Sequence, residues 1–230
     1  GRARFVQHYQ QHAGIEPASS AIAAERREAW PGGRTNHYLF DMNRDWFALT
    51  QPETLGRVDS MLEYYPLVHA DIHEMGTNST YYFPPPAQPF NPHITAQQKA
   101  GFDALGRGMA DVFDRFGFDY FTREVFDALY PGYGDSWPTL HGSLGMTFET
   151  ASARGLSGQR SDGSIVTYRD GVHRHFLATV GTLIVAAKDR KKLLDRFFEF
   201  RRTALSDKRV YGLSLTRNDP HLLDQLSNRL

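Results

Sequence analysis

The chemistry open to this chain is limited by its side chains, which include ten histidines and no cysteine. Without thiols the chain forms neither disulfides nor thiolate zinc sites, so any metal ion must be held by His, Asp or Glu. Two histidine pairs, His8/His12 and His69/His73, are spaced by four residues. The first lacks the glutamate of a metalloprotease helix. The second lies in a predicted strand, in which four residues span roughly 13 Å, too far for one metal ion.

Several other functional classes are excluded by what the sequence lacks. The run closest to a nucleophile elbow, His141-Gly142-Ser143-Leu144-Gly145, begins with His instead of Gly, and no glycine-rich phosphate loop ending in Gly-Lys-Ser/Thr occurs. Lys plus Arg and Asp plus Glu both number 26, so there is no basic field that would attract nucleic acid or an anionic membrane. The longest apolar stretch, 179–187, is far shorter than the roughly 20 residues of a membrane span.

Three polar segments carry the remaining chemistry: Asp41-Met42-Asn43-Arg44-Asp45, Asp71-Ile72-His73 and Thr147-Phe148-Glu149. The Asn-Arg pair offers an amide donor and a planar guanidinium, which together match a terminal carboxylate. A histidine at a strand end can give a neutral nitrogen to a metal ion, and a strand-end glutamate can take a proton from water. Each also has an ordinary interpretation, since the Asn-Arg pair can cap a loop and the glutamate can be a solvated strand end.

In their order and chemistry these segments resemble the M14 zinc metallocarboxypeptidase family, over about residues 1–205. The resemblance implies that Asn43 and Arg44 bind the free carboxylate of a peptide or protein substrate. It implies that His73 is the third ligand of a single zinc ion (Zn2+). Glu149 would be the general base that takes a proton from zinc-bound water and passes it to the departing amine. The implied activity is zinc-dependent hydrolysis of C-terminal peptide bonds.

Two further residues receive roles from the same resemblance. Asp41 would accept the proton of another zinc-bound histidine, absent from this chain, and so orient it. Tyr130 matches the mobile active-site tyrosine of the family, because the run from it to Gly134-Asp135-Ser136 keeps the spacing to a Gly-Gly-Ser-like turn. Tyr133 is the competing assignment.

The sequence departs from the family pattern in what it lacks. The His-x-x-Glu segment, which supplies two zinc ligands, and the arginine that follows it are absent, and the chain begins at Gly1 as though cut inside a later motif. We therefore expect residues 1–206 to be the C-terminal two-thirds of a catalytic domain. The alternative is a non-catalytic module that binds peptide C-termini through Asn43 and Arg44. The loop 130–149 is shorter than in digestive members, which leaves the side-chain preference open.

Hydrophobic periodicity predicts the elements that position these residues. Short apolar strands are expected at 67–73 and 144–149. Helices are expected at 51–65 with Thr50 and Glu53 forming a capping box, from Thr95 to about 116, at 171–204 as one long or two abutting helices, and at 219–230 with Asp219 as N-cap. The rest is expected to form a surface loop at 10–36 with a short helix at 20–28, a loop or hairpin at 152–170 and a strand at 208–215.

This alternation predicts an α/β fold, a three-layer α/β/α sandwich whose mixed sheet is mostly buried, truncated on its N-terminal side. The two apolar strands should be neighbours near the centre of the sheet, and apolar surface should be exposed where further strands would lie. Residues 207–230 are expected to form a strand–helix tail that could open a following domain. Oligomeric state and localisation stay open, although family analogy is compatible with a bacterial protein that is secreted or periplasmic.

The segment from Glu74 to Pro92 is expected to be a long loop without a central strand. It carries the aromatic run Tyr81-Tyr82-Phe83 and five prolines. Because prolines reduce the ordering entropy that ligand binding costs, we expect this loop to form one wall of the active-site cleft. The competing interpretation is that its aromatic rings fill the domain interior.

Overall fold

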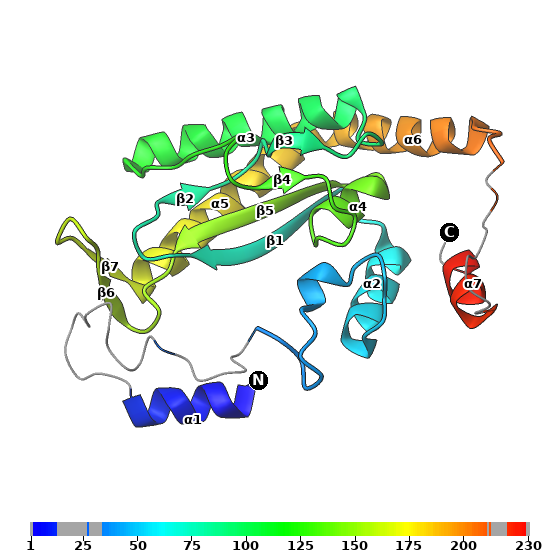
Figure 1. Cartoon of the computed structure of the whole chain (residues 1–230). Helices are drawn as coiled ribbons and strands as arrows, with labels where there is room; N and C mark the ends of the chain where they lie inside the picture. Colours follow the sequence, from blue (N-terminus) through cyan, green and yellow to red (C-terminus); the bar gives the residue numbers. More distant parts are fainter. Residues whose placement is uncertain (1, 13–26, 28–33, 211, 213–219, 229–230) are drawn as a thin grey trace.

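The protein forms a mixed α/β structure, seen here in a computed structural model that describes residues 2–12, 27, 34–210, 212 and 220–228 (Figure 1). At its centre are β1 (Val68–Met75) and β5 (Leu144–Ala151), which pair in parallel, while β2 (Tyr81–Tyr82) pairs antiparallel to β5. The order β1-β5-β2 makes the sheet mixed, and every residue of β5 is buried. The predicted fold class and the pairing of the two strands are thus confirmed. Each strand ends two residues later than the sequence predicts, at Met75 and at Ala151.

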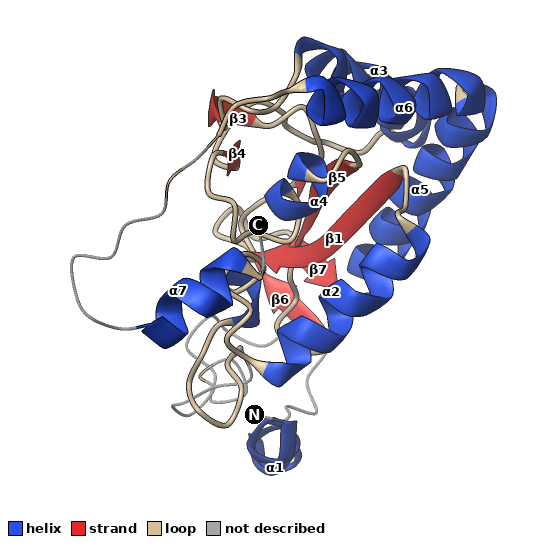
Figure 2. Ribbon diagram, turned by 90° about the vertical axis from the view of Figure 1, so that its right-hand side faces the viewer, coloured by secondary structure: helices blue, strands red, loops and turns tan. Residues whose placement is uncertain are grey.

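One face of the sheet packs on two long helices, α3 (Ala96–Phe116) and α5 (Tyr168–Lys188). Leu144, Met146 and Phe148 alternate along β5 and are at most 1% exposed on this side. Since successive side chains of a strand point to opposite faces, the residues between them face the other way. On that second face lies a smaller cluster of Trp46, Val58 from α2 (Pro52–Tyr64) and Trp137 from α4 (Ser136–Leu140). Figure 2 shows the two sides of the sheet.

Local capping explains where the main helices begin. At α3, Thr95 and Gln98 form the expected capping box, and Gly117 ends the helix at φ +66°. The prediction that Thr50 caps α2 was wrong. Gln51 is the N-cap and makes no capping bond; instead the buried Asp45 carboxylate accepts hydrogen bonds from both the Thr50 and Gln51 backbone N–H groups.

The predicted helical region near the end of the chain is two abutting helices, α5 and α6 (Arg190–Ser206). The first begins three residues before the predicted position, because Thr167 and Asp170 form a capping box. A hairpin of β6 (Ser157–Gln159) and β7 (Ile165–Thr167) precedes α5. The sequence had left open whether residues 152–170 form a loop or a hairpin.

The remaining described elements are α1 (Arg2–His12), the 3-10 helix η2 (Met42–Arg44), β3 (Ala87–Phe90), β4 (Asp127–Ala128) and α7 (Pro220–Ser227). Residues 10–12 are therefore helical and not loop. Residues 208–210 and 212 form no strand, and the rest of the predicted strand lies outside the described residues, as do Asp219 and almost all of the predicted helix at 20–28. The domain division at residue 206 stays a prediction.

The prediction for the segment Glu74–Pro92 was wrong in two respects. The segment contains β2, which pairs with β5, and β3, which pairs with β4. Its three aromatic rings, at positions 81–83, are 0–1% exposed and pack among other rings, with centroid distances of 4.6–4.7 Å to Phe113, Tyr120 and Phe126. Burying these three rings in the interior stabilises the fold more than exposing them in a cleft wall would.

Several large apolar side chains of the described residues are exposed. Ile72 is 49% exposed on β1, whose only partner among the described strands is β5. Further exposed apolar residues of this kind lie on α5 and α6: Val172, Phe176, Leu183, Ile184, Leu194 and Phe198. None of the described helices has the length and apolar character that a membrane crossing requires.

The close approach of β5 to the loop before α4 makes Gly145 sensitive to substitution. A Cβ atom there would overlap the backbone oxygen of Asp135, whereas one on Gly56 in α2 would meet nothing within 4 Å. Gly145→Ala should lower the free energy of unfolding by about 1–3 kcal/mol. Gly56→Ala should raise it by roughly 0.5–1 kcal/mol. Urea denaturation of both variants checks this, and equal effects would contradict the packing at Gly145.

Candidate functional site

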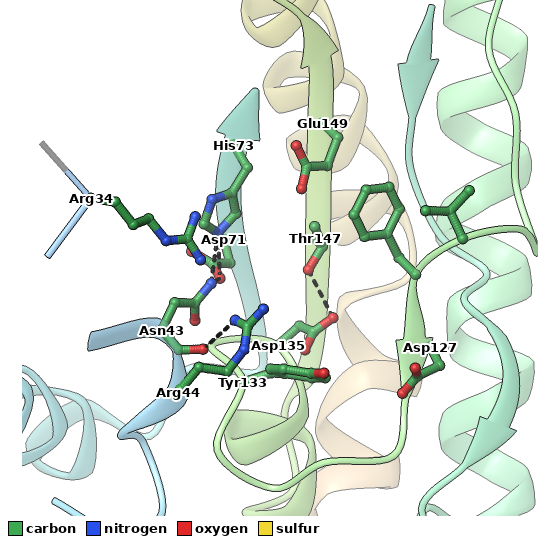
Figure 3. A pocket seen from close by; sticks show the side chains of 12 residues that line it. Arg34, Asn43, Arg44, Asp71, His73, Asp127, Tyr133, Asp135, Thr147 and Glu149 are labelled. Carbon is green, nitrogen blue, oxygen red and sulfur yellow. Dashed lines mark hydrogen bonds and ion pairs between the residues drawn. The ribbon is translucent and has the colours of Figure 1, made fainter. Parts of the chain in front are cut away.

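The strand pairing brings the polar residues of β1 and β5 together. In the register of this parallel pair, Asp71 is opposite Thr147 and His73 is opposite Glu149. Residues two apart on a strand share a face, so all four side chains lie on the face away from α3 and α5. Figure 3 shows them on one side of a pocket. The backbone pairing of β1 with β5 alone thus brings together two of the three polar segments, the one ending in His73 and the one ending in Glu149.

The third segment is placed by the side chain of Asn43. Its Oδ1 accepts hydrogen bonds from Trp46 Nε1 (3.1 Å) and from the backbone N–H of Gly134 (2.8 Å). Its Nδ2 donates to Asp71 Oδ2 (2.9 Å) and lies 2.9 Å from His73 Nε2. Asn43 therefore joins η2, β1 and the loop before α4 through both polar atoms of its amide.

Asp71 and His73 form a close polar pair, with His73 Nε2 2.8 Å from Asp71 Oδ2. The hydrogen bond to Asp71 raises the pKa of His73, although burial acts in the opposite direction. Burial alone would raise the pKa of Asp71, but hydrogen bonds from His73 and Asn43 bring it below its ordinary value. Sequence reasoning gave Asp71 no role, although its position two residues before His73 on a strand placed both on one face.

Glu149 is a buried carboxyl group whose pKa is strongly perturbed. It is 8% exposed, and its Oε2 is buried without a hydrogen-bond partner among the described residues. Burial raises its pKa to about 7, partly offset by the neighbouring His73. The group thus changes protonation state near neutral pH, as a general acid or base must.

Arg44 and two tyrosines form the opposite side. The guanidinium of Arg44 donates to the Asn43 backbone oxygen (2.8 Å) and lies 4.6 Å from the centroid of the Tyr133 ring. Tyr130 donates its hydroxyl to the Arg44 backbone oxygen (3.1 Å), and the two tyrosine rings meet edge to face. Tyr133 lines the pocket and Tyr130 does not, and the role of Tyr130 as the active-site tyrosine stays a prediction.

These residues enclose a cavity of about 240 Å³. Its lining is Arg34, Asn43, Arg44, Asp71, His73, Val125, Phe126, Asp127, Tyr133, Asp135, Thr147 and Glu149. No residue of the segment 74–92 is among them; the wall opposite β1 comes from residues 125–127 instead. Sequence reasoning missed Arg34, Asp127 and Asp135 as site residues, because only tertiary packing brings them to the strand ends.

Asp41 does not contact the pair formed by Asp71 and His73. It caps η2 by accepting the Asn43 backbone N–H (2.9 Å), and it forms an ion pair with Arg34 (3.0 Å). Its expected partner, a further zinc-bound histidine, has no counterpart in this sequence. The orienting of another histidine by Asp41 therefore stays a prediction.

The described residues do not make a complete zinc site. Such sites need at least three protein ligands, and no group of three His, Asp or Glu side chains in the described part of the chain is arranged to hold a metal ion. His73 suits the role of a single ligand: its Nε2 faces the Asp71 carboxylate, and no described residue hydrogen-bonds to its Nδ1. Carboxylates orient metal-binding histidines in this way.

The burial of Glu149 makes a prediction about stability and pH. Its pKa is raised from 4.5 to about 7 in the folded chain, so the folded state binds more protons than the unfolded state between these values. Stability should therefore fall as pH rises from about 4.5 to 7. In the metal-free chain, Glu149→Gln should be more stable than wild type at pH 8, by up to about 3 kcal/mol, and nearly equal at pH 4.

Denaturation at both pH values, with chelator present, measures the difference. The exposed Glu63 on α2 offers a matched control, since Glu63→Gln makes the same change of side chain outside the cavity. A difference at Glu149 that does not change with pH would contradict the buried carboxyl.

Comparisons with known proteins place this arrangement in a known fold. No family model and no curated protein sequence matches the chain. Among solved structures, the chain is similar to the metallo-carboxypeptidase from Pseudomonas aeruginosa in complex with (2-guanidinoethylmercapto)succinic acid, with a TM-score of 0.51 and 16% identity over 70% of this chain and 42% of that one. A metallo-carboxypeptidase from Burkholderia cenocepacia also matches, with a TM-score of 0.46 and 17% identity over 74% of this chain.

The chain spans about two fifths of the length of both structures, 42% and 40%. Identities this low establish the fold alone. The fold of the chain is similar to that of part of a metallo-carboxypeptidase.

Proposed function

We propose that this site binds the C-terminal residue of a peptide or protein and takes part in hydrolysing the bond before it, as in zinc metallocarboxypeptidases. The observation that carries the proposal is the pairing of Glu149 with His73 across β1 and β5, inside a cavity that also contains Arg44. A buried carboxyl with a free oxygen, a histidine and a guanidinium are the groups that peptide hydrolysis next to a free carboxylate requires.

Arg44 is proposed to bind the substrate carboxylate, because a guanidinium can donate two parallel hydrogen bonds to it. Tyr133 supports it through the contact between its ring and the guanidinium. Asn43 contributes by holding Asp71 and His73 in position. Tyr130, whose hydroxyl holds the backbone of Arg44, acts from outside the cavity.

Glu149 is proposed to accept a proton from water and to deliver it to the departing amine. Its pKa of about 7 allows both transfers near neutral pH. His73 is proposed as one ligand of a zinc ion whose other ligands, and the histidine that Asp41 would orient, come from outside these 230 residues. When bound, the ion would supply an activated water.

The ligand named in the Pseudomonas aeruginosa structure contains succinic acid, which is consistent with a carboxylate-binding site in this fold. A second candidate function is a non-catalytic module that binds peptide C-termini through Asn43 and Arg44. Such a module would need no metal ion, and both residues line the cavity.

Hydrolysis distinguishes the two candidates. In a longer protein that contains this chain and the two further ligands, Glu149→Gln should lower kcat for release of the C-terminal residue by about 10²–10⁴-fold, because the proton acceptor is lost. Zinc content, measured by mass spectrometry, should stay the same. Unchanged turnover would contradict the role of Glu149, and a wild-type protein that binds zinc and peptide but releases no residue would support the binding module.

The carboxylate role of Arg44 has its own test. Arg44→Lys should weaken the binding of an acetylated tripeptide with a free C-terminus by about 10–100-fold, because lysine cannot make the paired hydrogen bonds. The same peptide with an amidated C-terminus serves as the control in calorimetry, and its weak binding should not change. If the variant affects both peptides equally, Arg44 does not recognise the carboxylate.

A further inference from the structure

A second cavity, of about 210 Å³, lies among the helices α3, α5 and α6. The three helices contact one another, and Figure 2 shows them side by side. Because α3 and α5 cover the face of the sheet opposite the candidate active site, the two cavities lie on different sides of the sheet, and they share no lining residue. A ligand in the second cavity would therefore not touch the groups of the proposed reaction.

Most of the wall of this second cavity is apolar. Its apolar lining comes from all three helices: Ala100, Gly101, Ala104, Leu105, Val185 and Leu193. Backbone N–H and C=O groups inside a helix are already hydrogen-bonded to one another, so this part of the wall offers a ligand few hydrogen-bond partners. It suits an apolar body, whose burial is favourable in proportion to its area.

Three charged side chains complete the lining: Asp189, Lys192 and Arg196. The carboxylate of Asp189 accepts a hydrogen bond from Lys192 Nζ at 3.0 Å, so these two charges balance. Arg196 is half-buried, and no described residue accepts a hydrogen bond from its guanidinium. The cavity thus contains a cation whose N–H donors have no partner in the part of the chain that the structure describes.

The packing of α6 on α3 holds Arg196 in this position. A Cβ atom on Gly101 would lie 2.6 Å from Arg196 Nη1, so the glycine lets the guanidinium approach the backbone of α3. Burial lowers the pKa of Arg196, and the charge of Asp189 acts in the opposite direction without forming a hydrogen bond. A bound anion would supply both the counter-charge and the acceptors that the guanidinium lacks.

The size of the cavity indicates a small ligand. An apolar cavity of roughly 150 Å³ can hold benzene. The 210 Å³ found here therefore gives room for a chain of about six carbon atoms with a carboxylate. The C-terminus of a peptide fits less well, because its backbone amides would find few hydrogen-bond partners on the apolar wall. A free aliphatic acid has a single polar end.

We propose that this cavity binds a small aliphatic monocarboxylate, with the guanidinium of Arg196 donating to the carboxylate and the apolar lining enclosing the chain. A guanidinium can donate two parallel hydrogen bonds to a carboxylate, whereas Lys192 is exposed and paired with Asp189. The inference is independent of the proposed function, since it uses neither Arg44 nor Glu149.

Three probes test the proposal on the isotope-labelled full chain by NMR titration: hexanoate, hexanamide and acetate. Hexanoate should bind at least about tenfold more tightly than hexanamide, because the amide lacks the charge that Arg196 pairs with. It should also bind at least about tenfold more tightly than acetate, which lacks the apolar chain. The shifts of backbone amides should centre on Leu105, Val185 and Leu193.

Three outcomes of the titration would overturn the proposal. One is equal binding of hexanoate and hexanamide, which would exclude recognition of the carboxylate. Another is a set of shifts centred on His73 and Glu149, which would place the acid in the candidate active site. The third is the absence of hexanoate binding at about 10 mM, since such an affinity is too weak for a chain and a charge that are both buried.

Variants assign the binding to Arg196. Arg196→Met keeps an unbranched apolar stem, so it should reduce hexanoate affinity to that of hexanamide and leave hexanamide affinity within about twofold. Arg202→Met is the matched control on the same helix, because Arg202 pairs with Glu199 at 2.8 Å and does not line the cavity. It should leave both affinities unchanged.

A third variant tests the place of the chain. Ala104→Leu should fill the cavity and block hexanoate and hexanamide alike, with folding verified by urea denaturation. A preference for hexanoate that survives in Arg196→Met, an equal loss in Arg202→Met, or full binding to a folded Ala104→Leu variant would each overturn the assignment.

Discussion

The parallel pairing of β1 with β5 is the interaction on which the rest of the site depends. Its register sets Asp71 against Thr147 and His73 against Glu149. The same alternation sends Met146 and Phe148 to the opposite face, into the core formed with α3 and α5. Because a shift by one residue would exchange the two faces of a strand, the apolar core and the polar site enforce the same register.

Burial next to this pairing explains the electrostatics of the site. β5 is covered on both faces, so Glu149 is held in a poorly solvated position where its ionised form is disfavoured. Asn43 donates a hydrogen bond to Asp71, and Asp71 is paired with His73. The oxygen of Glu149 that points into the cavity, in contrast, has no hydrogen-bond partner among the described residues. The arrangement sacrifices stability at a place where reactivity is useful, a common property of functional sites.

The aromatic segment after β1 shows how a reasonable functional interpretation can fail. Proline content and large rings suggested a ligand-binding wall, yet the rings of Tyr81, Tyr82 and Phe83 are buried. The hydroxyl of Tyr81 lies 2.8 Å from His175 Nδ1, and His175 Nε2 lies 3.0 Å from the His73 backbone oxygen. The Tyr81 ring therefore supports the strand end from behind, whereas the Tyr82 ring, opposite Glu149 in the strand pairing, packs on the cavity-lining Phe126.

The amino-acid sequence by itself determined the α/β fold class, the two central strands, the start of α3 and the segments that hold His73, Arg44 and Glu149, because hydrophobic periodicity and capping are local properties. Only the tertiary structure decided which tyrosine lines the cavity, and only it brought Asp135 beside Thr147. It also decided that Asp45 accepts the backbone N–H groups of Thr50 and Gln51 just before α2, and that no side chain caps this helix. These outcomes depend on contacts between residues distant along the chain or on competition for one hydrogen-bond donor, and neither is encoded in residue spacing.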